Sequence, residues 1–186
     1  VLDLVLQAVA GAALGFLVAL VFAAVESAGG LVDLFGGFQM ATAFDPLSLT
    51  NGATFSRLYQ WLALALLVVS GGHQVVLAGL VRSFDVRPLG TAPDAAALAH
   101  TATQGLTGMV VAALQIAGPL LVVLFLADVG LGLLTRVAPA LNAFAMGFPL
   151  KVLLTISLGG MAVLTLPGVV SGLVRDATHA MQAVMP

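Results

Sequence analysis

Residues 106–127 read LTGMVVAALQIAGPLLVVLFLA, and no charged side chain interrupts them. A helix needs about 20 apolar residues to cross the hydrocarbon core of a bilayer, and this run is long enough. The segments that meet this test are Leu4–Val25, Leu58–Val81, Leu106–Ala127 and Val152–Val174. The repeated ten-residue alternation of outer-membrane strands does not occur. The sequence therefore predicts an all-α, membrane-associated protein built of hydrophobic helical hairpins.

The composition of the whole chain agrees with a membrane protein. Of 186 residues, 61% are hydrophobic and 8% are charged, and the formal net charge is −2. A soluble domain of this size has about 25% charged residues and needs them to cover its surface. A soluble enzyme or a nucleic-acid-binding domain is therefore excluded. The chain has no cysteine, so disulfides, thiolate nucleophiles and cysteine-based metal sites are excluded as well.

Several breakers interrupt the apolar runs. Gly71–Gln74 falls inside the second predicted span and Pro119 inside the third. Both are breakers at mid-depth, where non-helical or kinked backbone is tolerated only if it faces protein or a water-filled cavity. We therefore expect non-helical or kinked backbone at both places. Two shorter apolar stretches, Ala28–Phe44 and Val137–Leu150, contain Gly, Pro or a charge. After the Asp45-Pro46 turn, Ser56 is a candidate cap for the next helix.

Ionisable residues in apolar runs are costly and therefore candidates for function. Glu26 is interpreted as ending the first span at the membrane interface. Asp33 follows seven residues later, so both carboxylates would share one face of a continuous helix. Asp128 precedes Arg136 by eight residues, which is too far for a direct ion pair on a straight helix.

The sequence predicts no cofactor, no metal and no catalytic activity. His73, His100 and His179 are far apart and form no HExxH pattern. A catalytic metal needs about three clustered ligands, so His73 is expected to donate a hydrogen bond between helices instead. Ser70-Gly71-Gly72-His73 lacks the other elements of a nucleophile turn.

Two patterns suggest contacts between helices or within a channel. Gly11/Gly15 and Gly168/Gly172 have the GxxxG spacing that lets helices approach closely, although a chain with 21 glycines also produces this spacing by chance. Phe38 and its apolar neighbours surround a Gly36-Gly37 pair that is poor helix chemistry, which predicts a bent element there.

A set of short motifs follows in order along the chain: Ala28-Gly29, Asp33, Gly37-Phe38, Asp45-Pro46, Gly72-His73, Gly118-Pro119, Asp128, Gly132–Pro139, Asn142 and Gly147–Lys151. In this order and spacing, the motifs resemble the FliR family of flagellar biosynthetic proteins and its SctT-type virulence counterparts. The resemblance covers essentially all of residues 1–186. It implies one export-gate domain that corresponds to the C-terminal two-thirds or more of such a protein, with hydrophobic segments upstream.

The resemblance also implies a function. Family members are single-copy subunits of the type III export gate in the bacterial inner membrane, at the flagellar basal body. With FliP-like and FliQ-like subunits and an FlhB-like protein they form a gated conduit for unfolded flagellar proteins, in contact with membrane lipid and not with nucleic acid. A plug at Gly37–Ser56 is implied in the same way, and its residues would be Phe38, Met40, Phe44, Asp45 and Pro46. Residues expected to serve helix packing or assembly are Gly11, Gly15, His73, Pro119, Arg136, Pro149, Lys151, Gly168 and Gly172.

Other interpretations remain open at this point. A small-molecule transporter or channel would show matching broken segments in two halves, and Gly71–Gln74 and the Pro119 region do not match. A purely structural scaffold would use the same small and apolar residues as a pore. The apolar side chains of the predicted plug could instead pack under neighbouring helices.

We expect the chain to aggregate when neither detergent nor partner subunits are present. Its few charges leave far more exposed apolar surface than the few hundred Å² that a soluble monomer tolerates. Size-exclusion chromatography with light scattering checks this. A monodisperse monomer in detergent-free buffer would contradict it.

Overall fold

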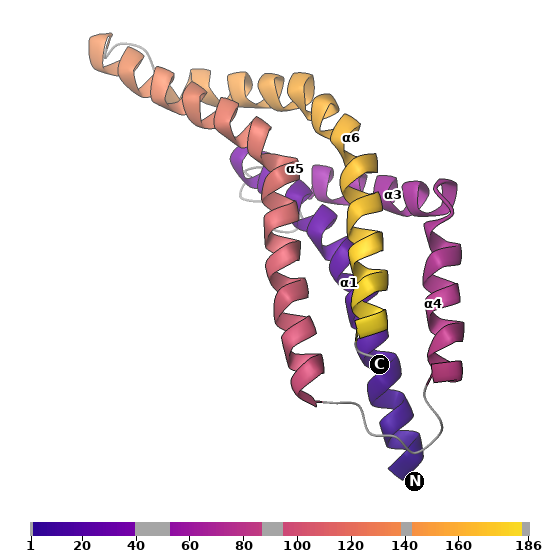
Figure 1. Ribbon diagram of the computed structural model, residues 1–186. Helices are drawn as coiled ribbons and strands as arrows, with labels where there is room; N and C mark the ends of the chain where they lie inside the picture. The colour runs from indigo at the N-terminus through magenta and orange to yellow at the C-terminus, as the bar shows by residue number, and fades with distance from the viewer. Residues whose placement is uncertain (1, 40–52, 87–94, 139–142, 184–186) are drawn as a thin grey trace, which may run out of the picture. The chain divides into compact units, whose positions relative to one another are not determined.

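The computed structural model describes residues 2–39, 53–86, 95–138 and 143–183, and every regular element in these ranges is a helix (Figure 1). The helices are α1 (Leu2–Phe35), α3 (Thr54–Val69), α4 (Gly72–Val86), α5 (Ala95–Val137) and α6 (Ala143–Ala183). The all-α prediction is confirmed. Two stretches, Val5–Phe35 and Ala96–Val137, are long and apolar enough to cross a membrane, and two bent helix pairs raise this number to four.

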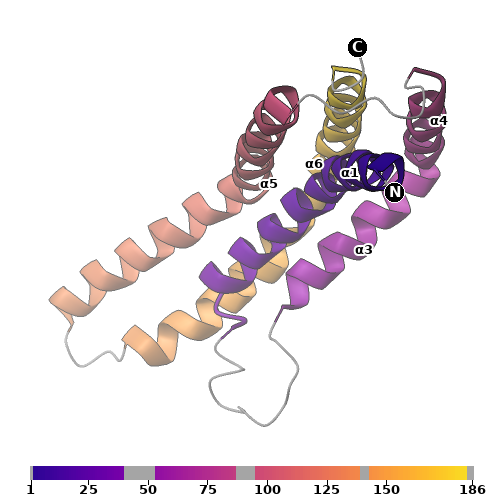
Figure 2. The same cartoon turned by 90° about the horizontal axis from the view of Figure 1, so that it is seen from below.

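The helices divide into two compact units, and α1, α3, α5 and α6 each contribute to both. Unit 1 comprises Val1–Ala24, Leu62–Ala112 and Pro167–Pro186, and unit 2 comprises Val25–Trp61 and Ala113–Leu166. Leu14, Leu17 and Leu20 form the core of unit 1, with Met109 packed against them. In unit 2, the last turns of α1 lie beside the beginnings of α3 and α6 (Figure 2). Its fully buried side chains include Val25, Val32, Tyr59, Ile116, Leu124 and Leu166.

Helix α1 continues past Glu26 and ends at a glycine pair. Gly37 has φ +84°, in the left-handed region that glycine adopts most readily. The Phe38 amide donates to the Asp33 carbonyl at 3.0 Å, which is the six-to-one bond of a Schellman motif. The bent element predicted from Gly36-Gly37 is therefore confirmed. Glu26 is exposed and lies within a helix that continues to Phe35, so its interpretation as the end of the membrane span stays a prediction.

The start of α3 is capped by a side chain from α1. The Phe55 and Ser56 amides donate to the two Asp33 carboxylate oxygens at 2.9 Å each. These are the second and third amides of the helix, which a capping side chain normally binds. Ala53, at the capping position, has no side-chain acceptor, so Asp33 takes over this task. The prediction of Ser56 as the cap was wrong, since its hydroxyl donates to the Glu26 carbonyl at 3.1 Å.

A glycine lets the two helices come this close. A Cβ on Gly29 would lie 2.5 Å from Ser56 Cα and 2.6 Å from the Phe55 carbonyl oxygen. Both neighbours are backbone atoms, which a rotamer change cannot move aside. Any larger residue at position 29 would therefore push the start of α3 away from the Asp33 carboxylate.

One of the two predicted helix breaks is present. Gly71, with φ +72°, separates α3 from α4, and the two helices meet at a bend of 72°. The Gly71 amide bonds to Val68 and the Gly71 carbonyl accepts from Gln74, so the break keeps its backbone groups paired. At Pro119 the non-helical alternative is wrong, because α5 runs through this residue without interruption.

Replacing Asp33 by Asn should destabilise unit 2. The asparagine side chain keeps one oxygen acceptor but loses the negative charge. Its NH₂ group would face one of the two backbone N–H donors, of Phe55 or Ser56. The expected cost is about 1–3 kcal/mol, the range for an unsatisfied buried hydrogen-bonding group. Thermal unfolding in detergent, followed by circular dichroism, measures the loss as a lower midpoint temperature.

The matched control is Glu26→Gln, which makes the same chemical change at an exposed position on the same helix. Its stability should stay within about 0.5 kcal/mol of the parent chain, as is usual for surface changes. If the two variants unfolded at the same temperature, Asp33 would not be the cap on which α3 depends.

Candidate functional site

The predicted plug is described only at its base. Met40, Phe44, Asp45 and Pro46 lie outside the described residues. Phe38 is half-buried, and its ring meets that of Phe55 edge-on, with the ring centres 5.1 Å apart. Aromatic pairs of this geometry contribute about 0.5–1.5 kcal/mol beyond the area they bury. Phe38 thus joins the end of α1 to the beginning of α3.

Phe55 lies at the centre of the contacts that form the base of the predicted plug. Its ring packs edge-on against Tyr59 at 6.1 Å, and its Cε1 lies 2.8 Å from where a Cβ on Gly159 of α6 would be. Its amide is one of the two that Asp33 binds. We refer to Asp33, Phe38, Phe55, Tyr59 and Gly159 as the base cluster. The base cluster holds together the two ends of the segment that joins α1 to α3.

Sequence reasoning missed most of the base cluster, although a signal was present. Val25, Gly29, Val32 and Gly36 recur at spacings of four, three and four, the pattern of a helix-packing face. Gly29 and Gly36 are seven residues apart, so the GxxxG spacing does not reveal this face. Nor does a local pattern reveal Gly159, because its close neighbour Phe55 is distant in sequence.

The two GxxxG pairs do not pack within the described part of the chain. A Cβ on any of Gly11, Gly15, Gly168 and Gly172 would meet nothing within 4 Å. Gly11 and Gly15 are both exposed. These faces are therefore open, and their predicted contact with partner helices stays a prediction.

An ion pair joins α5 and α6, the two helices that contain the predicted assembly residues Pro119, Arg136, Pro149 and Lys151. Lys151 Nζ of α6 lies 2.8 Å from an Asp128 oxygen of α5, with the side chains 23% and 47% exposed. Nearby, the Leu131 Cδ1 atom lies 3.3 Å from where a Cβ on Gly147 would be. From the sequence alone, Arg136 was the residue compared with Asp128 as an ion-pair partner. Lys151, which forms the pair in the structure, was not. Arg136, in the last turn of α5, and Pro149 on α6 are exposed.

An apolar cavity of about 290 Å³ lies between the same two helices, and Pro119 contributes to its wall. Ile116 and Leu120 line it from α5, and Leu158 and Met161 from α6. A proline in a membrane helix is tolerated where neighbouring helices or polar groups satisfy the freed backbone carbonyl. Pro119 therefore shapes the packing of α5 without breaking it.

His73 and His100, the histidines whose side chains are described, belong to no cluster of three or more metal-ligating residues. His73 Nδ1 is buried and lacks a hydrogen-bond partner in the described part of the chain, so the bond expected between helices is not seen for this atom. His100 Nε2 lies 3.5 Å from Gln104 Nε2 on the same helix, and the side chain of His179 is outside the described residues. Within the described ranges, no three of His, Asp and Glu come together to hold a metal ion.

Residues 1–177 match the protein family described as bacterial export proteins, family 1. The chain is 38% identical over 154 residues to the flagellar biosynthetic protein FliR of Escherichia coli K12, covering 82% of this chain and 58% of that protein. It is 30% identical over 149 residues to FliR of Bacillus subtilis 168, covering 78% and 58%. The surface presentation of antigens protein SpaR of Shigella flexneri is 26% identical over 150 residues, covering 81% and 58%.

The chain spans less than two thirds of the length of these relatives. Its match to the family nevertheless extends over nearly all of its own residues. The resemblance predicted from the order of the motifs is confirmed. The chain belongs to the bacterial export proteins, family 1.

Proposed function

We propose that the chain is part of a single-copy subunit of the flagellar type III protein export gate. In this proposal it assembles with FliP-like and FliQ-like subunits and an FlhB-like protein. Together they form a gated conduit for unfolded flagellar proteins in the bacterial cytoplasmic membrane, at the flagellar basal body. The higher identity to FliR than to SpaR supports the flagellar system over the virulence systems.

The observation that carries the proposal is the apolar surface that the chain leaves uncovered. In α1 and in α5, only 33% of the most apolar 18-residue stretch is buried. Large side chains such as Phe125 on α5 and Leu164 on α6 are 63% and 79% exposed. Helices that are apolar all round are stable only inside a membrane or a larger assembly. A subunit that completes its packing with partners fits this requirement.

A conduit subunit of this kind performs no chemistry of its own. It needs close-packing faces for its partners and a closure that opens without breaking strong bonds. The open faces at Gly11/Gly15 and Gly168/Gly172 suit the first need, because small residues let backbones approach. Apolar side chains suit the second, because an apolar constriction excludes water and ions without forming polar contacts.

We place the closure in Gly37–Ser56, as the family resemblance implies. The base cluster supports this assignment, since it fixes both ends of the segment, Phe38 at one end and Phe55 at the other. Phe38 acts as the anchor of the plug. Met40 and Phe44 supply the bulky, adaptable apolar surface.

Bulky residues on the open glycine faces should block assembly. In Gly11→Leu/Gly15→Leu, no atom of the chain lies where the new side chains begin, and leucine favours the helix more than glycine does. We expect co-purification of FliP-like and FliQ-like subunits to fall roughly tenfold or more, as a loss of about 1.4 kcal/mol in association produces. Native mass spectrometry gives the amounts and the copy number.

Gly160→Leu is the control for this experiment, because position 160 is equally open but lacks the GxxxG spacing. It should assemble like the parent chain, with one copy per complex. Normal assembly of the double variant would contradict a packing role for the pair. More than one copy per complex would contradict the single-copy subunit.

Deleting Ala41–Thr50 should leave the complex assembled and make it leak ions. Residues 39, 40 and 51–54 still bridge the ends that the base cluster holds, so unit 2 can fold without the deleted part. Conductance in planar bilayers is expected to rise above the closed level, and changing Phe38, Met40 and Phe44 to Ala should act in the same direction.

Phe16→Ala is the control for the plug, because it removes a ring that is 40% exposed on α1, away from the base cluster. It should keep the closed conductance. A deletion complex that is intact and still closed would show that the plug lies elsewhere and that Phe38 only packs between helices.

A further inference from the structure

A buried hydroxyl, that of Thr155 on α6, has no role in the contacts described above. The side chain of Thr155 has no exposed surface, and its Oγ1 atom has no hydrogen-bond partner in the described part of the chain. A buried hydroxyl without a partner costs free energy and is rare in native structures. Its presence in unit 2 therefore needs a physical explanation.

The hydroxyl is turned away from the acceptor that a threonine inside a helix normally uses. Thr103, Thr107 and Thr135 each donate to the backbone carbonyl four residues earlier in their own helix, at 2.7, 2.9 and 3.2 Å. Thr155 lies in the interior of α6, where the same kind of bond is open to it. Within the described ranges it makes no such bond, so its hydroxyl gives up a local acceptor and faces another helix.

The helix that Thr155 faces is α1, at the turn where α1 ends. A Cβ on Gly36 would lie 2.6 Å from Thr155 Oγ1 and 2.7 Å from the Val32 carbonyl oxygen. The hydroxyl and this carbonyl oxygen are therefore at most 5.3 Å apart, the two distances added. The Val32 carbonyl already accepts the Gly36 amide at 2.8 Å. An acceptor thus lies close to the Thr155 hydroxyl but is occupied by another donor.

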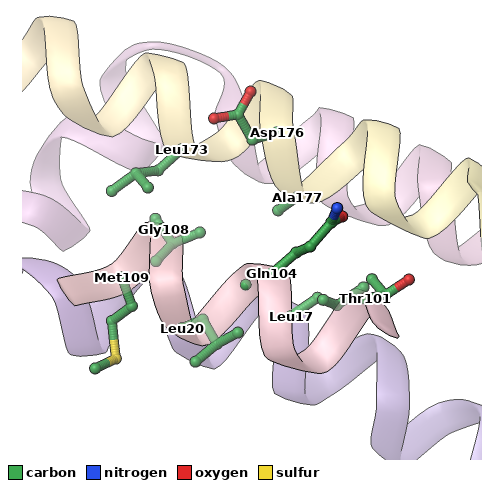
Figure 3. A pocket seen from close by; sticks show the side chains of 11 residues that line it. Leu17, Leu20, Thr101, Gln104, Gly108, Met109, Leu173, Asp176 and Ala177 are labelled. Atoms are coloured by element: carbon green, nitrogen blue, oxygen red, sulfur yellow. The ribbon is translucent and has the colours of Figure 1, made fainter. Parts of the chain in front are cut away.

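The surroundings of Thr155 do not favour water as its partner. Polar side chains elsewhere adjoin open space; Thr101 and Gln104, for example, line a cavity of about 190 Å³ in unit 1 (Figure 3). Thr155 lines neither this cavity nor the one beside Pro119. A buried water needs room and two or more polar neighbours. A second conformation of α1 is therefore the better source of an acceptor.

The last turn of α1 has the backbone freedom that a second conformation requires. Gly36 and Gly37 are adjacent, and Gly37 already has φ +84°. Glycine reaches both halves of φ space without a steric penalty, so this pair can rotate where other residues could not. If the turn unwound, the Val32 carbonyl would lose the Gly36 amide, and the Thr155 hydroxyl would be free to donate to it.

We propose that Thr155 is the donor of a two-state switch at the end of α1. In the closed form, which is the one described above, the Gly36 amide binds the Val32 carbonyl and Thr155 has no acceptor. In the open form the last turn of α1 unwinds and the Thr155 hydroxyl donates to the released carbonyl. The hydroxyl therefore favours the open form twice, because it is unpaired in one form and paired in the other. The inference rests on the proposed function in one respect, that the open form carries Phe38 away from Phe55 and so releases the plug.

Amide hydrogen exchange of the full-length protein in detergent, followed by mass spectrometry, measures the switch, because amides at the end of α1 exchange from the open form. Thr155→Val removes the hydroxyl and keeps a branched side chain of nearly the same shape. We expect exchange at residues 34–39 to slow roughly tenfold, the effect of one buried hydrogen bond. The thermal midpoint should equal that of the parent chain or rise, since the closed form loses only an unpaired donor.

A second pair of variants avoids placing a methyl group against Gly36. Thr155→Ser and Thr155→Ala differ from each other only in the hydroxyl, and the serine variant should exchange roughly tenfold faster at residues 34–39. Thr103→Val is the control at another site, because the Thr103 hydroxyl is bonded within its own helix. Its exchange at residues 34–39 should match that of the parent chain.

Two results would overturn the switch. One is a lower thermal midpoint in Thr155→Ala than in Thr155→Ser, which would show that the hydroxyl is already bonded in the closed form, for example to an internal water. The other is equal exchange of these two variants at residues 34–39.

Single-channel recordings of the assembled complex separate this inference from the proposed function. Slower exchange together with fewer openings in Thr155→Val would support both the switch and the plug. Slower exchange with unchanged openings would support the switch and overturn the assignment of the plug to Gly37–Ser56.

Discussion

One residue, Asp33, ends one helix and begins the next. Its backbone carbonyl accepts the amide that closes α1, and its carboxylate accepts the two amides that open α3. A carboxylate with no exposed surface is stable only when it is paired, and the first turn of a helix offers both donors and a favourable dipole. Because α3 starts from this point, Phe55 is held against Gly159 and Phe38, and the rest of unit 2 is built around that contact.

The remaining helices are not stabilised by such a cluster, because contacts within the chain cover only a small part of their apolar surface. Buried residues such as Ile116 and Leu124 form a narrow strip of α5, while Val122 and Phe125 on the same helix are 59% and 63% exposed. In water, a helix with this much exposed apolar surface would not be stable without further packing partners. In lipid no free energy is gained by hiding apolar groups from the solvent, so contacts form where small residues and polar pairs allow them. The Asp128–Lys151 pair between α5 and α6 is a contact of this kind.

Local signals predicted the fold, and contacts between distant residues limited the prediction of the site. Long apolar runs gave the helices, and the glycine pairs at 36–37 and 71–72 gave the end of α1 and the break between α3 and α4. The cap on α3 comes from a residue 22 positions away, so the nearby Ser56 was the wrong choice. Glu26 could not be assigned because one charge in an apolar run fits an exposed helix face as well as a membrane boundary. Pro119 looked like a break because the sequence does not reveal the neighbours that let α5 continue.

The base cluster also has a consequence for how this part of the chain can diverge. Its hydrogen bonds and ring contacts fix the two ends of the segment between α1 and α3 independently of what lies between them. Doubling the length of a flexible connection whose ends are already held together costs only about 0.6 kcal/mol in closure entropy. Insertions, deletions and sequence drift between residues 40 and 52 are therefore nearly neutral for folding. Selection on that stretch acts on what it does, while selection on Asp33, Gly29 and Phe55 acts on whether the unit forms.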